Sequence, residues 1–320
     1  MKAVASAPGK VILFGEHAVV FGKPALAMAV NRRARVQVEQ VNPEEIYITI
    51  PDLDVKGVLT PQKELECSGT GKPGILRYII EAIKLLDMEG GLEVKVELEI
   101  PIGAGMGSSA AITVATLAAL FKLQGKNLDK EELARKAHQV ELEVQGAASP
   151  LDTAVSTQGG VVYLNSEGEA QNLEVPGQLP LVVAYTNYRG NTGELVAGVR
   201  DRRDAHPRVV DPILEAMEMI THRARQALQE EDEKILGELM NINHGLLDAL
   251  GVNTPELSRM VYQARTAGAR GSKITGAGGG GSIIAYAPGR VEQVLNKLQE
   301  EEEAFRVGMS RTGVELEDSS

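Results

Sequence analysis

The chain has 320 residues, of which 43% are hydrophobic and 3% aromatic, and its formal net charge is −11. A chain of this length can bury the core of one large domain or of two lobes, and its hydrophobic content argues against intrinsic disorder. The negative charge and the scarcity of aromatic side chains argue against nucleic acid or an anionic membrane as the main partner.

The cysteine content and the N-terminal sequence bear on the cellular compartment. Cys67 is the only cysteine, so no intramolecular disulfide can form, which favours a reducing compartment. The first ten residues, MKAVASAPGK, lack the apolar stretch of a signal peptide, and no run approaches the roughly 18 apolar residues of a membrane span. We therefore expect a cytoplasmic globular protein.

The first half of the chain mixes strand and helix patterns. Residues 92–100 alternate between apolar and charged side chains, which indicates a strand with one face in water. Asp129 and Glu132 have the spacing of a capping box, and Ser149-Pro150 is typical of a helix start. The other predicted strands are 36–41, 46–50 and 160–164. The predicted helices are 74–87, the apolar segment 108–123, 129–145, and a short one that ends near 159–160.

The second half is mainly helical. After a strand at 181–186, residues 192–266 read as helices with a break at His206-Pro207. A strand at 282–286, a helix at 291–303 with a solvated acidic end, and a strand at 305–316 follow. We expect an α+β fold with antiparallel or mixed sheets in two lobes, residues 1–180 and 181–320.

A glycine-rich loop, PIGAGMG (residues 101–107), separates the strand at 92–100 from the apolar helix. The backbone N–H groups of such a loop and of the helix's first turn can point at one anion, and glycines let a phosphate approach closely. Ser108 and Ser109 add hydroxyls that suit phosphate or a divalent metal. The alternative is a tight turn with serine caps.

Two familiar phosphate-binding motifs are excluded. GxxxxGK[ST] occurs nowhere, so the chain is no P-loop NTPase. GxGxxG fails in the loop because Ser108 takes the place of the third glycine. It does match residues 276–281, but a strand follows there instead of a helix, so the Rossmann context is missing.

Three separated segments resemble motifs 1, 2 and 3 of the GHMP kinases, a family of ATP-dependent small-molecule kinases. They are APGKVILFGEHAVV (residues 7–20), the glycine loop with its helix start, and KITGAGGGG (residues 273–281). The order and spacing of all three fit across the whole chain. The resemblance implies a two-lobed fold with ATP at the glycine loop between the lobes, together with Mg²⁺.

The acceptor is suggested by three further segments. GEHAVVFGKPAL (15–26), NHGLL (243–247) and NTPEL (253–257) resemble the family members that phosphorylate the 5-hydroxyl of mevalonate, a step of isoprenoid biosynthesis. Members acting on galactose usually carry an acidic residue where this chain has Ala18-Val19. Another kinase of the family, acting on phosphomevalonate or a sugar, and an inactive ligand sensor are the alternatives. A homodimer is considered as the assembly.

The resemblance also implies residue roles for the phosphate side of the site. Asp152 would accept the proton of the attacking hydroxyl and Lys10 would neutralise charge beside it, whereas Ser108 and Glu141 would hold Mg²⁺. This chain reads Ala-Ser-Pro-Leu-Asp before Thr153, where the family usually has Pro-Ser-Gly-x-Asp. The ATP-binding residues would be Pro101, Ile102, Gly103, Ala104, Gly105, Met106, Gly107, Ser108, Ser109, Ala110 and Ala111.

Without the resemblance, each of these residues has a plain structural interpretation. Asp152 would be a first-turn carboxylate favoured by the helix dipole, Glu141 or Glu143 a solvated helix charge, and Lys10 a surface lysine at a strand start.

On the acceptor side, the resemblance implies that Glu16 binds a hydroxyl group of the substrate and that His17 binds its carboxylate. Thr192, Thr275, Gly276, Ala277 and Gly278 complete the implied substrate-binding set.

Overall fold

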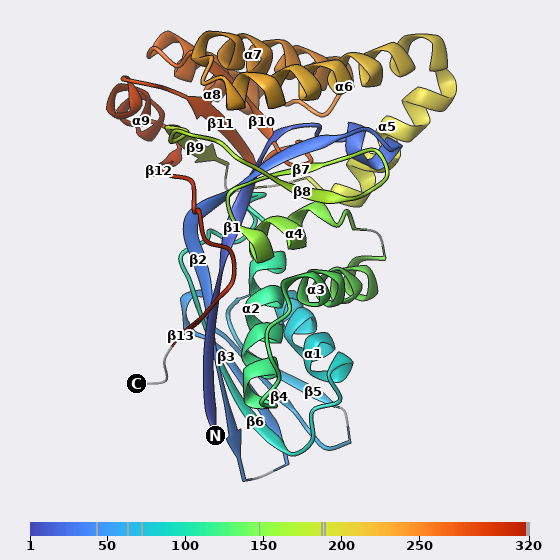
Figure 1. Ribbon diagram of the computed structural model, residues 1–320, viewed down its shortest axis with the longest axis vertical. Coiled ribbons are helices and arrows are strands. Elements are labelled where there is room, and N and C mark those ends of the chain that lie inside the picture. The colour runs from blue at the N-terminus through green and yellow to red at the C-terminus, as the bar shows by residue number, and fades with distance from the viewer. Residues whose placement is uncertain are drawn as a thin grey trace.

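The computed structural model describes residues 1–317 except positions 43, 63, 72, 147, 187 and 189. Within these ranges the chain forms two β-sheets, each covered by helices, and the two layers follow one another along the long axis of the molecule (Figure 1). The predicted α+β class is confirmed.

The large sheet is built from the first half of the chain and closed by its last strand. Its order is β13-β1-β2-β6-β3-β4-β5, with β7 on the first part of β2 and β8 beside β7. The β3–β6 pairing is parallel and the others are antiparallel. The strands are β1 (Lys2–Phe14), β2 (Ala25–Val41), β3 (Ile46–Ile50), β4 (Val55–Leu59), β5 (Leu65–Gly69), β6 (Gly91–Leu98), β7 (Val161–Leu164), β8 (Ala170–Leu173) and β13 (Glu315–Glu317).

Helices cover one face of this sheet. They are α1 (Leu76–Leu85), α2 (Ser108–Leu123), α3 (Lys130–Gln145) and α4 (Leu151–Gln158). α2 packs on β1 and β2 and is enclosed by the other three helices, so nearly all of its side chains are buried. Because α2 is enclosed on all sides, its sequence is apolar all round. The same packing holds the start of α2 against β1.

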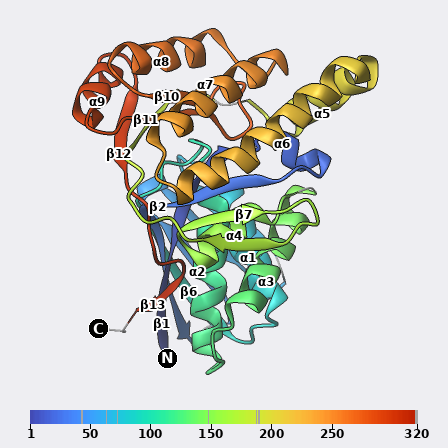
Figure 2. The same cartoon turned by 45° about the horizontal axis from the view of Figure 1, so that its top comes forward.

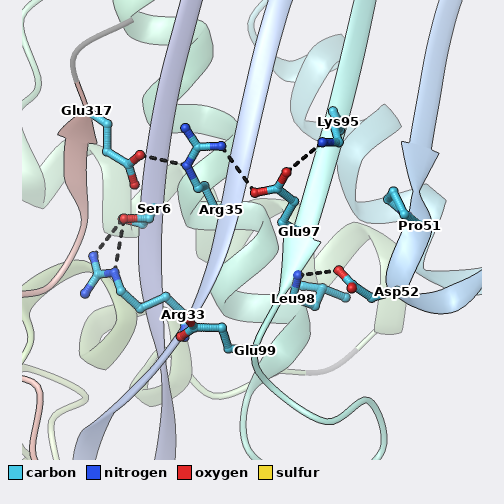
Figure 3. A pocket seen from close by; sticks show the side chains of 10 residues that line it. All are labelled: Ser6, Arg33, Arg35, Pro51, Asp52, Lys95, Glu97, Leu98, Glu99 and Glu317. Carbon is cyan, nitrogen blue, oxygen red and sulfur yellow. Dashed lines mark hydrogen bonds and ion pairs between the residues drawn. The ribbon is translucent and has the colours of Figure 1, made fainter. Parts of the chain in front are cut away.

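The other face of the large sheet is polar. A groove of about 500 Å³ lies there, lined by Ser6 of β1 and by charged side chains of β2, β6 and β13 (Figure 3). Arg35 is bonded to Glu317 at 2.7 Å and to Glu97 at 3.3 Å, and Glu97 also contacts Lys95. Strand alternation therefore sends Val36 and Val96 to the helices and the charges to this groove.

The small sheet, of order β10-β11-β9-β12, carries the helices of the second half. Its strands are β9 (Leu181–Tyr185), β10 (Gly271–Thr275), β11 (Ser282–Tyr286) and β12 (Glu303–Val307). α7, α8 and α9 pack on it, and α5 lies at the opposite end of this layer from α9 (Figures 1 and 2). These helices are α5 (Thr192–Ala205), α6 (Pro207–Gln229), α7 (Glu233–Ala249), α8 (Pro255–Thr266) and α9 (Val291–Gln299).

The structure differs from the predicted elements at several ends. Most of β1, the first part of β2, and strands β4, β5, β8 and β10 have no counterpart among the predicted strands. α9 ends at Gln299, and Glu303 begins β12 instead of ending the helix. The predicted strand at 305–316 is replaced by β12 and the separate β13. α4 begins at Leu151, and the Ser149 hydroxyl accepts the Leu151 N–H at 3.3 Å.

Two further observations concern the whole chain. Strands β1 to β8 lie in the large sheet and β9 to β12 in the small one, so the chain passes from one sheet to the other near residue 180. β13 is the exception, because it pairs with β1 in the large sheet. None of the helices in the described part of the chain combines the length and apolar composition that a bilayer crossing requires.

Candidate active site

The glycine loop is held from both sheets. On one side, the Lys10 backbone N–H of β1 donates to the Met106 carbonyl at 2.9 Å. On the other side, the Ser282 hydroxyl of β11 donates to the Ala104 carbonyl. Gly107 has φ +67°, and a Cβ there would lie 2.9 Å from Cγ of Lys10. Glycine at this position is therefore required both by the backbone and by the lysine stem packed against it.

The loop ends at the N-terminus of α2. Gly107 is the N-cap and supplies no side-chain bond, so the N–H groups of the first turn are available to a ligand. Gly103, Gly105, Ser108 and Ser109 are at least partly exposed. Among the predicted ATP-binding residues, Ala104, Met106, Ala110 and Ala111 are buried in the core and can offer only backbone groups.

Lys10 and Asp152 form an ion pair beside this helix start. Nζ of Lys10 lies 3.1 Å from Oδ1 of Asp152; the lysine is 4% exposed and the aspartate 30%. β1 brings the lysine and the first turn of α4 brings the aspartate. The pair thus has a buried cation and a carboxylate that solvent or a substrate can reach.

Glu141 lies next to this pair, on α3. It is 3% exposed, and the Ser109 hydroxyl donates to its Oε1 at 3.2 Å. Burial, with the negative charge of Asp152 as a second cause, raises the pKa of Glu141 to about 8; the Ser109 bond and Lys10 oppose this shift. The hydroxyl that contacts Glu141 is therefore that of Ser109. The expected role of Ser108 as a Mg²⁺ ligand stays a prediction.

Glu16 does not face an open site. It is 1% exposed, its Oε1 accepts from Nζ of Lys273 in β10, and its Oε2 accepts from Nδ2 of Asn243 in α7 at 3.2 Å. Both carboxylate oxygens are engaged, so the expected contact with an acceptor hydroxyl is replaced by this buried network. Lys273 and Asn243 received no role from the sequence, although each lies in a segment used for the resemblance.

His17 faces the loop after β10. Its Nε2 lies 2.8 Å from the carbonyl oxygen of Ala277, which can only accept, so Nε2 carries the hydrogen. Burial lowers the pKa of His17, and its Nδ1 is buried without a partner among the described residues. An imidazole whose Nδ1 has a free lone pair suits a hydroxyl donor. The contact with a carboxylate expected from the sequence stays a prediction.

The remaining predicted substrate residues lie along the contact of the two sheets. Thr275 accepts the Ile12 N–H at 2.9 Å and donates to the Ile12 carbonyl at 3.1 Å, which ties β10 to β1. A Cβ at Gly276 would lie 3.7 Å from the Gly105 carbonyl, and one at Gly278 only 2.2 Å from that of Val252. The loop 275–278 therefore sits between the glycine loop and the turn that precedes α8.

Thr192 is exposed in the first turn of α5. Gly190, two residues before Thr192, lies close to the glycines that follow β10: a Cβ on Gly190 would be 3.0 Å from the Gly279 carbonyl. The start of α5 is thus close in space to the loop after β10. The structure shows no role for the Thr192 side chain itself.

Comparisons with known proteins identify the family of the chain. Residues 76–160 match the family model of the GHMP kinase N-terminal domain, and residues 224–304 match that of the C-terminal domain. The chain is 47% identical to the mevalonate kinase of Methanothermobacter thermautotrophicus, over 98% of this chain and 100% of that relative. It is 46% identical to that of Pyrococcus furiosus, over 93% of each.

Solved structures give the same result for the fold. The Methanococcus jannaschii mevalonate kinase superposes with a TM-score of 0.80 at 28% identity, covering 96% of this chain and 98% of that one. The L. major mevalonate kinase in complex with R-mevalonate superposes with a TM-score of 0.82 at 27% identity, covering 96% of each. The chain therefore belongs to the GHMP kinases and, within them, to the mevalonate kinase family.

Proposed function

We propose that this chain transfers the γ-phosphoryl group of ATP to the 5-hydroxyl of mevalonate, giving ADP and 5-phosphomevalonate. The observation that carries the proposal is the Lys10–Asp152 ion pair beside the uncapped start of α2. It combines a cation and a reachable carboxylate with an anion-binding helix N-terminus. The mevalonate kinases among its relatives, one of them solved with R-mevalonate, support the choice of acceptor.

The triphosphate of ATP would lie along the glycine loop. Backbone N–H groups of residues 103–107 and of the first turn of α2 would bind its oxygens, and the positive end of the helix dipole would stabilise their charge. The partly exposed residues Pro101 and Ile102 would border the nucleotide on the side of β6. The buried side chains of Ala104, Met106, Ala110 and Ala111 would contribute to ATP binding indirectly, by anchoring the loop and the start of α2 in the core.

In the reaction, the 5-oxygen of mevalonate attacks the γ-phosphorus while the bond from that phosphorus to the β–γ bridging oxygen breaks, and ADP leaves. Asp152 first accepts a hydrogen bond from the hydroxyl and then takes its proton. Lys10 stabilises the negative charge that develops on the transferring group and on the oxygen nucleophile. The fixed Met106–Lys10 backbone bond keeps the lysine in register with the loop.

The residues present fit Mg²⁺. Glu141 is a buried carboxyl whose charged form is destabilised by burial and by Asp152, and a hard cation would relieve both effects. Glu141, with the hydroxyls of Ser108 and Ser109, would hold the ion together with phosphate oxygens and water. When bound, Mg²⁺ neutralises phosphate charge. Among the described residues no group of three or more His, Cys, Asp and Glu side chains is arranged as a metal site.

The acceptor would lie between Asp152 and the loop after β10. Nδ1 of His17 would accept a hydrogen bond from a mevalonate hydroxyl, and the backbone of Gly276, Ala277 and Gly278 would close one side of the site. Thr275 acts through its bonds to β1, and Thr192 would border the acceptor from α5. The division into lobes near residue 180, a homodimer and a cytoplasmic location stay predictions.

The acceptor assignment predicts a strong preference in a coupled ADP-release assay. We expect kcat/KM for mevalonate to exceed that for galactose, homoserine and phosphomevalonate by at least about 100-fold, roughly 2.7 kcal/mol. Comparable turnover of phosphomevalonate or galactose would leave the family assignment intact and overturn the substrate. Binding of ATP and mevalonate without turnover would indicate a ligand sensor instead of an enzyme.

The raised pKa of Glu141 predicts how Mg²⁺ dependence varies with pH. Because the folded-state pKa lies near 8, above the ordinary value of 4.5, the carboxyl is protonated at neutral pH and loses its proton when it binds a cation. The half-saturating Mg²⁺ concentration should therefore rise as pH falls below 8, by up to about tenfold per pH unit.

Titrations of turnover with Mg²⁺ between pH 6 and 9 check this expectation. Glu141→Gln should raise the Mg²⁺ requirement about tenfold at pH 9, remove its pH dependence, and change the mevalonate KM little. Glu143→Gln, on the exposed side of the same helix, is the matched control and should behave like the parent. An unchanged titration in Glu141→Gln would exclude Glu141 as a ligand.

A further inference from the structure

Glu16, Lys273 and Asn243 form a network that is closed to solvent, at 1%, 0% and 0% exposure. Lys273 donates to Glu16 and also to the Ile274 carbonyl at 2.6 Å, and Asn243 donates to the second oxygen of Glu16. The three residues come from the turn after β1, from β10 and from α7. A single side-chain cluster therefore joins elements of the large sheet, the small sheet and its helical layer.

The backbone fixes where this network forms. A Cβ at Gly271 would lie 2.3 Å from the Gly237 carbonyl, so two glycines let α7 rest directly on β10. Asn241 continues the contact: it donates to the Arg270 carbonyl at 3.0 Å and accepts the Ser272 N–H at 3.1 Å. Further along α7, Asn243 reaches Glu16 with an amide N–H bond of 3.2 Å.

The network ends at both sides of the proposed acceptor site. Glu16 is followed directly by His17, whose φ of +60° lies in the left-handed region that side chains other than glycine rarely adopt. Lys273 is followed four residues later by Ala277, the partner of the His17 ring. The ion pair and the His17–Ala277 bond thus hold the same two segments together at two points.

Stability alone gives little reason for such a pair. Desolvating both charges offsets much of their attraction, so an apolar pair of similar volume is often as stable, whereas directional bonds to fixed partners define geometry. The strained backbone at His17 also needs surrounding contacts that hold it.

We infer that Lys273, Glu16 and Asn243 are positioning residues for the acceptor: they hold the turn at 15–17 so that Nδ1 of His17 faces the substrate. This inference rests on the proposed function. All three residues are engaged within the protein, so in the proposed site none of them would contact the reacting atoms. Their loss should therefore weaken acceptor binding while the phosphate side of the site, built on α2, Lys10 and Asp152, stays intact.

The test is a set of variants read by thermal unfolding and by steady-state kinetics. Glu16→Gln or Lys273→Met alone leaves one buried charge unpaired and should lower Tm strongly. The double variant Glu16→Gln/Lys273→Met removes both charges and should recover most of the loss in Tm. Its KM for mevalonate should still be raised at least about tenfold, with KM for ATP within about twofold of the parent.

Asn243→Ala covers the case in which the double variant does not fold. It removes the bond to Glu16 but keeps the ion pair, and should raise the mevalonate KM about fivefold. Asn241→Ala is the matched control on the same helix: it loosens α7 from β10 without contacting Glu16, so it should lower Tm and leave the mevalonate KM unchanged. A mevalonate KM within twofold of the parent in Asn243→Ala, or in a folded double variant, would overturn the inference.

A spectroscopic readout separates this inference from the proposed function. In ¹⁵N imidazole spectra of the ligand-free protein, the His17 resonances are identified as those that disappear in His17→Gln. In the parent and in Asn241→Ala, these resonances should have the chemical shifts of the Nε2–H tautomer. They should shift toward averaged tautomer values in Asn243→Ala. If mevalonate is not turned over at all, the proposed function fails while this comparison still decides the positioning role. Unchanged His17 resonances in Asn243→Ala would overturn it.

Discussion

Replacing Asp152 with asparagine is expected to lower kcat about 1,000-fold, roughly 4 kcal/mol of transition-state stabilisation, while ATP affinity changes less than about threefold. The amide has the size of the carboxylate but can neither take the proton of the hydroxyl nor balance the Lys10 charge 3.1 Å away. ATP affinity should survive because the loop and the start of α2 are held by β1 and β11, not by Asp152.

Single-turnover kinetics with saturating mevalonate and an ATP-binding titration measure these two effects separately. Glu218→Gln serves as the control, because Glu218 pairs with Lys23 at 2.6 Å outside the site. It should retain the parental kcat. A fall of less than about tenfold in Asp152→Asn would correspond to under roughly 1.4 kcal/mol, too little for the proposed role.

Lys10→Met is expected to reduce kcat about 100- to 1,000-fold, comparable to the loss of a single charge-stabilising donor in other enzymes. Methionine keeps an unbranched stem against Gly107, so the loop should stay in place while the ammonium group is lost. Because Lys10 is 4% exposed, its charge acts in surroundings poor in water, where its effect on a developing negative charge is large.

The same assay on Lys23→Met provides the comparison, since it removes the cation of the Lys23–Glu218 pair. That variant should be close to the parent in kcat and in both KM values. If Lys10→Met retained more than about a tenth of the parental kcat, the cation would be a structural partner of Asp152 and the transition-state role would be wrong.

Local patterns predicted the elements whose signals lie within a few residues. α2, α3 and β11 begin and end within one residue of their predicted ranges, and the Asp129 carboxylate accepts from the N–H groups of Glu131 and Glu132 as a cap. The glycine loop could be predicted as a phosphate site because so many glycines before an apolar helix destabilise the fold and are expected only where a ligand must approach the backbone closely. The Lys10–Asp152 contact, across 142 positions, was expected only through the family resemblance.

Features that depend on how distant segments dock were not predictable from those patterns. β1 contains Pro8-Gly9, and both residue types argue against a strand. The strand nevertheless continues past them because β1 pairs with β2 on both sides, with a register shift between Pro8 and Lys10. Ser109 rather than Ser108 reaches Glu141 because the docking of α3 on α2 decides which side of the helix start faces it. Lys273 sits in a strand that is otherwise typical of a core, and its partner Glu16 lies 257 positions away.

The pairing of β13 with β1 has a consequence for how the protein is made. Val4 is opposite Glu317, and Arg33 donates to the Gly313 carbonyl at 2.7 Å, so one edge of the large sheet is completed only by β13 and the residues just before it. At about 5–20 residues per second, roughly 15–60 s of translation separate β1 from β13. During that time the first residues of β1 present an open edge on the ribosome, and this edge of the large sheet stays open until β13 has been made.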